Sequence, residues 1–431
     1  MSLASQFLSA MLTDGSVPEF ISLGPIEHLF KGENEKTMFV FVQGHVKKYA
    51  KLPSIDTVES HTKLDVTSGD ENWTYYFDIL KKRHVEKTLK AGMTDASLHL
   101  QGDSLDTDQA LKVMTETVMG LIRENTAMEI VDFRDAYDAV IGAYAAEYQG
   151  GLESGFRFGW PTIDEMTGGL VRGDMASIIG RPSRGKTFFS LYAASSQWFE
   201  VGKAMLENPG GDFPCHHSRL FVSMEMSIDQ IRQRLAAMIT KVPAMKLKHA
   251  ELSSIYMKKL KAGLHEIKGF GAPFWIVDGG LASTVEDIWL RARQLKPDAI
   301  FIDGAYLLKH PTEQDRFRRA AENAELIKKE LSPLAPTICS YQFAKLKKNS
   351  GKQPKEAPTL DDIGYSDVIA QVSSLVLGLL EADTIETLKS RKISILKGRG
   401  GETGFANVNF DAEKMEFGEI VEEALSELQV E

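Results

Sequence analysis

The sequence of 431 residues contains only two cysteines, Cys215 and Cys339, which lie far apart and outside any C-x-x-C pair. Zinc motifs and disulfide frameworks need more, or more closely spaced, cysteines, so neither is expected. The chain also lacks a run of about 18 uncharged apolar residues, which a membrane-spanning helix would need. Its start, MSLASQFLSAMLTDG, lacks the basic segment that opens a signal peptide. These absences predict a protein of the reducing cytoplasm, with no membrane partner.

An excess of positive charge is missing as well. The formal net charge is −10, which argues against a basic coat over the whole surface. Binding of nucleic acid depends on where charges lie, so a local basic channel remains compatible with this composition. The hydrophobic fraction of 43% and the charged fraction of 26% are typical of a globular protein, and the length allows two or three domains.

Hydrophobic patterning divides the chain into four regions. The first has apolar residues at three- and four-residue spacing and predicts an all-α N-terminal domain. The second is a short amphipathic helix followed by glycines, which is typical of a linker. The third alternates short apolar strands with helices, and the fourth is an acidic tail. The expected limits are 1–125, 126–150, 151–412 and 413–431.

Two features of the helical regions carry specific expectations. Pro53 should end the helix of EKTMFVFVQGHVKKYAKLPS, because proline cannot continue a helix. The linker helix has an apolar face that requires a partner, either within its own domain or on a neighbouring subunit. That face is formed by Tyr137, Val140, Ile141 and Tyr144.

The third region contains seven short apolar segments that read as strands. They are MASIIG, RLFVSME, FWIVD, AIFID, TICSYQ, SSLVLGLL and RKISILKG. Strands that alternate with helices predict an α/β domain with a mostly parallel sheet and helices on both faces. The last segment and the following GFANVNFD predict an antiparallel hairpin at the sheet edge.

A phosphate-binding loop, G-x-x-x-x-G-K-T, lies between the first of these strands and a helix. Its glycines let the backbone curl so that N–H groups face phosphate oxygens, and the helix adds its positive N-terminal end. Lys186 is expected to reach the β- and γ-phosphates, and Thr187 to offer its hydroxyl to Mg²⁺. The residues expected to bind the nucleotide are Gly180, Arg181, Pro182, Ser183, Arg184, Gly185, Lys186 and Thr187.

Two acidic residues at strand ends complete a hydrolysis site. Asp303 ends the strand of DAIFIDG and is the expected second ligand of Mg²⁺. Glu225 follows RLFVSM and could polarise water for in-line attack. In isolation, an aspartate in a turn and a solvated glutamate would be the ordinary interpretations; the phosphate loop favours the catalytic ones.

The chain resembles the DnaB family of replicative DNA helicases at five segments in the family's order. FGWPTIDEMTGGLVRGDMASIIGRPSRGKT resembles the approach to the phosphate loop, SMEM the catalytic-glutamate segment, and AIFIDGAYLL the Walker B strand. TICSYQ ends in Gln342, which matches the glutamine that senses the γ-phosphate. ILKGRGGETG resembles the K-x-R-x-G segment, with Lys397 and Arg399. The layout is closest to phage-encoded members.

The resemblance implies a RecA-like ATPase domain in a ring of six identical subunits that moves along single-stranded DNA, 5′ to 3′, and unwinds the replication fork. ATP and Mg²⁺ would lie between subunits. Lys397 and Arg399 would come from the neighbouring subunit, Arg399 as an arginine finger. A primase and a helicase loader are the implied partners, in the cytoplasm of a bacterial or phage-infected cell.

Two segments depart from the family pattern. Asp303 is followed by Gly304 and Ala305, where the family carries tyrosine and leucine, and Tyr306 is the nearest substitute. In DIGYSDVIAQ, the typical arginine, glutamate and glycine are replaced, so the family's DNA contacts cannot be carried over there. The preceding FAKLKKNSGKQPKEAPTL suits sequence-independent phosphate contacts instead, although a solvated charged loop is the alternative. The expected DNA-binding residues are Lys345, Lys347, Lys348 and Lys352.

Three other functions fit parts of the pattern. A RecA-like recombinase would share the core but form open filaments without a helical collar domain. A KaiC-like regulatory ATPase would carry two tandem P-loop domains, and only one is present. An interaction protein with a dead site is disfavoured by the intact phosphate loop and acidic residues. Fork unwinding with DNA-stimulated ATPase activity would separate a helicase from all three.

Overall fold

The computed structural model describes residues 2–23, 26–30, 32–101, 105–124, 137–148, 155–182, 184–208, 217–280, 283–342, 367–380 and 389–420. Two compact units, Met1–Asp138 and Ala139–Glu431, divide the chain inside helix α7 (Tyr137–Tyr148). The described helices do not include one with both the length and the apolar character that crossing a bilayer needs.

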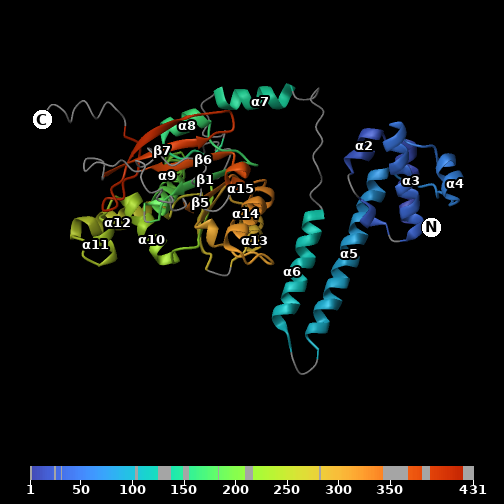
Figure 1. Ribbon diagram of the computed structural model, residues 1–431, viewed down its shortest axis with the longest axis horizontal. Coiled ribbons are helices and arrows are strands. Elements are labelled where there is room, and N and C mark those ends of the chain that lie inside the picture. The colour runs from blue at the N-terminus through green and yellow to red at the C-terminus, as the bar shows by residue number, and fades with distance from the viewer. Residues whose placement is uncertain are drawn as a thin grey trace, which may run out of the picture. The chain divides into compact units, whose positions relative to one another are not determined.

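The regular secondary structure among the described residues of the N-terminal unit is helical (Figure 1). Phe7, Phe39 and Leu80 lie in its core, contributed by α1, α3 and α5. α5 and α6 pack along each other as a long antiparallel pair. The elements are α1 (Leu3–Asp14), α2 (Val17–Ser22), η1 (Glu27–Leu29), α3 (Glu33–Tyr49), α4 (Ile55–Thr62), α5 (Trp73–His99) and α6 (Thr107–Glu124).

The helix that Pro53 was expected to end stops earlier. α3 ends at Tyr49, and Ala50 adopts a left-handed conformation with φ of 50°. The Ala50 N–H donates to the carbonyl of Val46 at 2.9 Å, which closes the last turn. The expectation was wrong because a left-handed cap on a non-glycine residue leaves no sequence signal. Pro53 instead precedes Ser54, the N-cap of α4.

The second unit is built on an eight-stranded sheet in the order β3-β2-β4-β5-β1-β6-β7-β8. β1 to β6 run parallel, and β7 and β8 continue as an antiparallel hairpin at the edge, as the sequence predicts. All seven segments read as strands are strands. They are β1 (Met175–Gly180), β2 (Arg219–Ser223), β3 (Phe274–Asp278), β4 (Ala299–Asp303), β5 (Thr337–Gln342), β6 (Leu375–Leu380) and β7 (Ser390–Lys397), followed by β8 (Gly404–Asn409).

Helices cover both faces of this sheet (Figure 1). α9 packs along β1, β5, β4 and β2, and α10 packs against β3 and α9. The chain moves in the reverse direction along the sheet after β3, so right-handed crossovers put α13, α14 and α15 on the opposite face. The helices are α8 (Pro161–Thr167), α9 (Lys186–Glu207), α10 (Ile228–Thr240), α11 (Ala244–Lys248), α12 (Ser254–Ile267), α13 (Val285–Leu295), α14 (Arg316–Leu326) and α15 (Asp367–Val372), with short turns η3 (Ala305–Leu307) and η4 (Ile327–Leu331).

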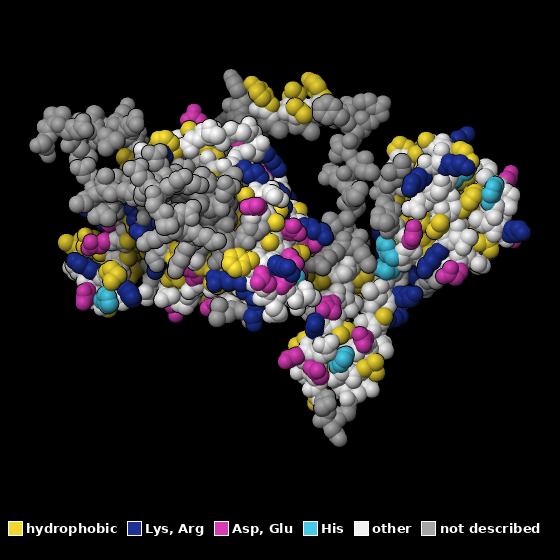
Figure 2. Space-filling model, viewed as in Figure 1, with side chains coloured by type: hydrophobic (Ala, Val, Ile, Leu, Met, Phe, Trp, Pro, Cys, Tyr) yellow, Lys and Arg dark blue, Asp and Glu magenta, His cyan; other side chains and the backbone are white. Residues whose placement is uncertain are grey.

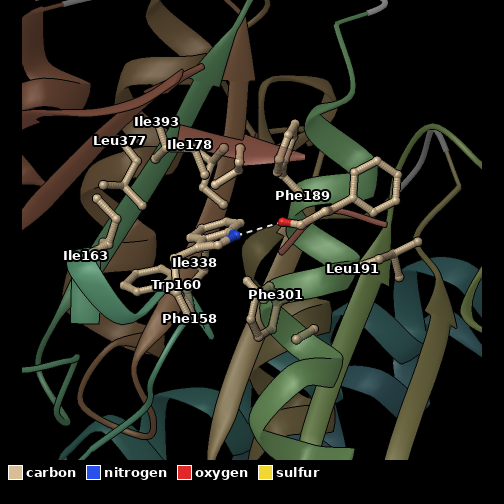
Figure 3. Packing of buried hydrophobic residues seen from close by; sticks show 14 of the residues in the cluster. Phe158, Trp160, Ile163, Ile178, Phe189, Leu191, Phe301, Ile338, Leu377 and Ile393 are labelled. Atoms are coloured by element: carbon tan, nitrogen blue, oxygen red, sulfur yellow. Dashed lines mark hydrogen bonds between the residues drawn. The ribbon is translucent and has the colours of Figure 1, made fainter. Parts of the chain in front are cut away.

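Aromatic side chains join the segment before β1 to the end of the chain. Trp160 is fully buried, stacks on Phe158 with centroids 6.0 Å apart, and donates from Nε1 to the carbonyl of Phe417 at 2.9 Å (Figure 3). Phe417 and Met415 are themselves fully buried in the same core. Packing therefore continues past residue 412, the limit expected for this domain, while residues 421–431 of the acidic tail lie outside the described ranges.

Candidate nucleotide site at the carboxyl edge of the sheet

The register of the parallel strands brings the expected site residues to one edge of the sheet. Gly180, the last residue of β1, is aligned with Gln342, the last of β5. Ser223 at the end of β2 is aligned with Asp303 at the end of β4, and Glu225 follows two residues later. The carboxyl edge of a parallel sheet is where α/β proteins bind ligands.

The phosphate loop connects β1 to α9, which begins at Lys186. Gly185 has φ of 95°, a left-handed conformation that favours glycine, and a Cβ there would also collide with the ring of Phe410. The Lys186 side chain is buried, and its Nζ donates to the carbonyl of Arg181 at 3.2 Å. Ser183, one of the residues expected to bind nucleotide, lies outside the described residues.

Opposite charges surround the buried lysine. Burial lowers the pKa of Lys186, and the nearby carboxylates of Glu225 and Asp303 oppose that shift. The pKa of Asp303 is raised by complete burial, which the neighbouring hydroxyls of Thr187 and Ser340 partly offset. Lysine and aspartate thus lie close enough for each to stabilise the charged form of the other.

Ser340 and Tyr306 are the residues here to which sequence reasoning gave no role in hydrolysis. The Ser340 hydroxyl donates to Asp303 Oδ1 at 2.8 Å and accepts from the N–H of Gly304 at 2.8 Å. Asp303 Oδ2 is buried and has no hydrogen-bond partner within the described part of the chain. The position of Ser340 two residues before Gln342, in a strand already expected to end at the site, was the available signal.

Tyr306 connects the glutamate and the glutamine of the site. Its hydroxyl donates to Oε1 of Glu225 and accepts a hydrogen bond from Nε2 of Gln342. The Tyr306 ring is 4% exposed, and the Arg316 guanidinium lies 5.7 Å from its centroid. The sequence identified Tyr306 only as the nearest substitute for an absent family tyrosine.

The two basic residues of the K-x-R-x-G segment lie at the other edge of the sheet. Lys397 is aligned with Val376 at the start of β6, and its Nζ donates to three carbonyls at the end of α15, those of Ala370, Gln371 and Ser373. Arg399 forms an ion pair with Asp174 at 2.9 Å, immediately before β1. Within the described ranges, the partners of both residues lie at this edge and not in the phosphate loop of the same chain.

The lysines expected to bind DNA fall outside the described residues. Lys345, Lys347, Lys348 and Lys352 belong to residues 343–366, and the first residue described after them is Asp367 at the start of α15. Their role therefore stays a prediction.

A comparison with known protein families shows the family of this chain. The family described as the DnaB-like helicase C-terminal domain matches residues 151–419, more than half of the chain. This chain belongs to that family. The resemblance drawn from the five motifs is confirmed, and membership favours the helicase over the recombinase and regulatory-ATPase alternatives.

Curated relatives of this DnaB-family chain are distant but extensive. A probable plasmid replicative DNA helicase of Chlamydia psittaci is 26% identical over 66% of this chain and 59% of its own length. A replicative DNA helicase DnaB of Geobacillus stearothermophilus is 23% identical over 89% of this chain and 83% of its own length.

Solved structures share the fold. A DnaB-like replicative helicase, solved in a study of its interactions with primase, covers 97% of this chain and 99% of its own, with a TM-score of 0.59 at 17% identity. A solved ATPase domain covers 68% of this chain and all of its own, with a TM-score of 0.56 at 22% identity. These matches confirm the expected fold class, an α/β ATPase domain preceded by helices.

Proposed function

We propose that this DnaB-family replicative helicase hydrolyses ATP at the carboxyl edge of its sheet and uses the energy to move along single-stranded DNA and unwind the fork. The observation that carries the proposal is the meeting of Lys186, Asp303, Glu225 and Gln342 beside the phosphate loop. Each occupies a position where a phosphate, a metal ion or an attacking water needs its chemistry.

The phosphate loop and Lys186 bind the triphosphate. The positive end of α9 and the backbone N–H groups attract its oxygens, and Lys186 exchanges its bond to the Arg181 carbonyl for the β- and γ-phosphates. Mg²⁺ suits the residues present, because it prefers hard oxygen ligands and Asp303 Oδ2 is buried without a partner within the described chain. Thr187 and Asp303 would hold the ion, which supplies charge neutralisation at the phosphates.

Glu225 and Gln342 act on the water and on the γ-phosphate. Glu225 follows β2, which β4 and β5 separate from β1 and the phosphate loop, and its exposed carboxylate still lies near Lys186 at the carboxyl edge. It can therefore accept a proton from the attacking water. Gln342 ends the strand next to β1, and its amide can donate to a γ-phosphate oxygen. Together they distinguish a bound triphosphate from a diphosphate.

Assembly into a ring of identical subunits would bring a further positive charge, that of Arg399 from the neighbouring subunit, to the γ-phosphate. Arg399 lies at the opposite sheet edge from its own phosphate loop, so it can serve a nucleotide only on a neighbouring copy. An arginine finger stabilises the charge that develops on the γ-phosphate. Closed rings arise when such a head-to-tail contact repeats through a rotation that closes, here six times.

Two apolar surfaces of the second unit suit this head-to-tail contact. α7 exposes hydrophobic side chains, with Val140 55% and Ile141 49% exposed (Figure 2). A cavity of about 580 Å³ opens between α10, α12 and the edge strand β3, and Leu260, Leu264 and Phe274 are among its lining residues. Seating α7 of one copy in the cavity of the next would cover both.

The further partners follow from the relatives. The solved DnaB-like helicase interacts with primase, and we assign the same class of partner, together with a helicase loader, to this chain. Replication of bacterial, plasmid or phage DNA would place it in the cytoplasm.

Forked DNA with one tail blocked at a time tests the function directly. The wild type should unwind a fork whose 5′ tail is free and stall when that tail is blocked, while a recombinase or a regulatory ATPase would unwind neither. Lys186→Ala should lose ATP binding or turnover, because it removes a ground-state phosphate contact.

The catalytic assignment has its own variant. Glu225→Gln should bind ATP but retain less than about a tenth of the wild-type kcat, a change of about 1.4 kcal/mol or more in the barrier. Asp229→Asn, four residues further on the exposed start of α10, is the matched control and should leave kcat unchanged. A Glu225→Gln variant with near-normal turnover would show that another group activates the water.

A further inference from the structure

Tyr306 is the one side chain that bonds to both hydrolysis residues within the described chain. Its hydroxyl is hydrogen-bonded to Oε1 of Glu225 and to Nε2 of Gln342, and its ring is buried. Glu225 and Gln342 come from different strands, β2 and β5, with β4 between them. Tyr306 follows β4 and so bridges the gap between the two.

The residues around Asp303 explain why a tyrosine reaches this position. Gly304 adopts φ of 85°, which turns the chain sharply out of β4 into the short turn η3 that carries Tyr306. A Cβ on residue 304 would lie 3.0 Å from Cγ of Glu225, so only a glycine lets the glutamate approach without displacement. The departure of this segment from the family pattern therefore has two structural consequences. Gly304 leaves room for the Glu225 side chain, and Tyr306 donates a hydrogen bond to that side chain.

The hydrogen bonds at Tyr306 leave the reactive positions available. Glu225 uses Oε1 for the tyrosine, so Oε2 can still face a water molecule. Gln342 donates one N–H of its side-chain amide to the Tyr306 oxygen. Because the amide nitrogen carries two hydrogens, the second can donate to a γ-phosphate oxygen.

We propose that Tyr306 is a positioning residue for ATP hydrolysis in this chain. It holds the carboxylate of Glu225 in the orientation that activates water, and it ties that orientation to Gln342, which contacts the γ-phosphate. The inference rests on the proposed function of the site. Hydrogen bonds to charged groups in partly dry surroundings are among the stronger ones, so losing this one has a measurable effect on turnover.

Tyr306→Phe removes the hydroxyl and keeps the ring. We expect kcat to fall about tenfold or more, with ATP affinity and KM within about twofold of wild type. The reason is that the hydroxyl's hydrogen bonds within the described residues go to Glu225 and Gln342, the residues assigned to the water and the γ-phosphate. A defect in folding or in nucleotide binding would move KM or affinity instead. Turnover is measured in a coupled ATPase assay, and affinity with a fluorescent ATP analogue.

Tyr192→Phe is the matched control. Its hydroxyl donates a hydrogen bond to the carbonyl of Gly159 at 3.1 Å, from a position on α9 and to a partner that is neither Glu225 nor Gln342. It should leave kcat unchanged. A Tyr306→Phe protein with normal kcat, or with raised KM and normal kcat, would overturn the proposal.

A double variant tests the connection between the two partners. If Tyr306 acts by joining Gln342 to Glu225, Tyr306→Phe should cost much less in a Gln342→Ala background than in the wild type. Effects that simply multiply would refute the connection. Should Tyr306→Phe fail to fold, 3-fluorotyrosine at position 306 keeps the ring and strengthens the donor, and an unchanged kcat then counts against the proposal. Loss of turnover in Glu225→Gln with none in Tyr306→Phe would leave the proposed function intact and remove only this inference.

Discussion

The position of Arg399 leads to a test of whether one subunit completes the site of the next. Arg399 pairs with Asp174, the residue before β1, whereas the phosphate loop begins at the other end of that strand. A six-residue strand spans about 20 Å, far more than the length of an arginine side chain. Action within one chain would require the domain to unfold, so we predict that Arg399 acts on a neighbouring subunit.

Complementary defects make this prediction quantitative. Arg399→Ala keeps its phosphate loop and loses the finger, while Lys186→Ala keeps the finger and loses the loop. An arginine finger contributes about 10³–10⁵ in rate, so each pure ring should be nearly inactive. In randomly mixed rings, an interface works when an Arg399→Ala subunit binds ATP next to a Lys186→Ala subunit, which at equal mixing holds for about a quarter of interfaces.

The assay is the ATPase rate against mixing ratio at fixed total protein. We expect a bell-shaped curve that peaks near equal mixing at about a quarter of the wild-type rate. Mixing Arg399→Ala with a double variant that carries both changes is the matched control and should restore nothing. A flat line near zero would refute the reasoning, provided that labelled subunits are seen to exchange between rings and that hydrolysis does not require a strict sequence around the ring.

Two further predictions concern DNA and pH. Replacing Lys345, Lys347 and Lys348 by alanine should weaken single-stranded DNA binding about equally for all sequences and flatten its salt dependence by about 0.7 log–log units per lost contact. An unchanged salt slope in fluorescence anisotropy would put the DNA path elsewhere. Burial lowers the pKa of His217 to about 4, and the nearby charge of Arg219 contributes to this shift. The unfolded chain therefore binds a proton at His217 more readily than the folded chain does. The free energy of unfolding should fall by up to about 3 kcal/mol as pH drops from 6.5 to 4. Urea unfolding at several pH values measures this loss of stability. The loss should be smaller in His217→Asn, in which asparagine tolerates the φ of 49° at this position. An equal pH dependence in that variant would assign the loss to other groups.

The fold of the second unit could be predicted because its signals are local. The strands β1, β2, β4 and β6 are short runs buried on both faces, and such a run of mainly apolar residues can be recognised from the sequence without knowing its neighbours in the sheet. The phosphate loop is equally local: Gly185 must adopt a positive φ and lie against Phe410, and the motif preserves that glycine. The carboxyl-edge position of Asp303 and Gln342 then follows from parallel strands alone.

Contacts between distant segments could not be predicted in the same way. That Ser340 orients Asp303 depends on the register between β4 and β5, for which the chain carries no local signal. Tyr306 reaches Glu225 only because Gly304 turns the chain by a particular angle. Sequence reasoning located these residues near the site but had no means of stating which atoms would meet.

Lys397 and Arg399, at the amino edge of the sheet, differ in how readily each can leave its present partners to contact ATP on a neighbouring subunit. Lys397 donates to three carbonyls at the end of α15, so moving it would leave a helix end without its cap. Arg399 has an ion pair with Asp174; the arginine side chain is 64% exposed, whereas that of Asp174 is buried. If Arg399 leaves, Asp174 keeps a hydrogen bond from the N–H of Val171 at 3.0 Å and the nearby positive charge of Lys328. A triphosphate on the next subunit offers the guanidinium far more charge than one carboxylate. Arg399 can therefore leave its one ion-pair partner more readily than Lys397 can leave three carbonyls, and Lys397 keeps α15 and the start of β6 in place for the contact.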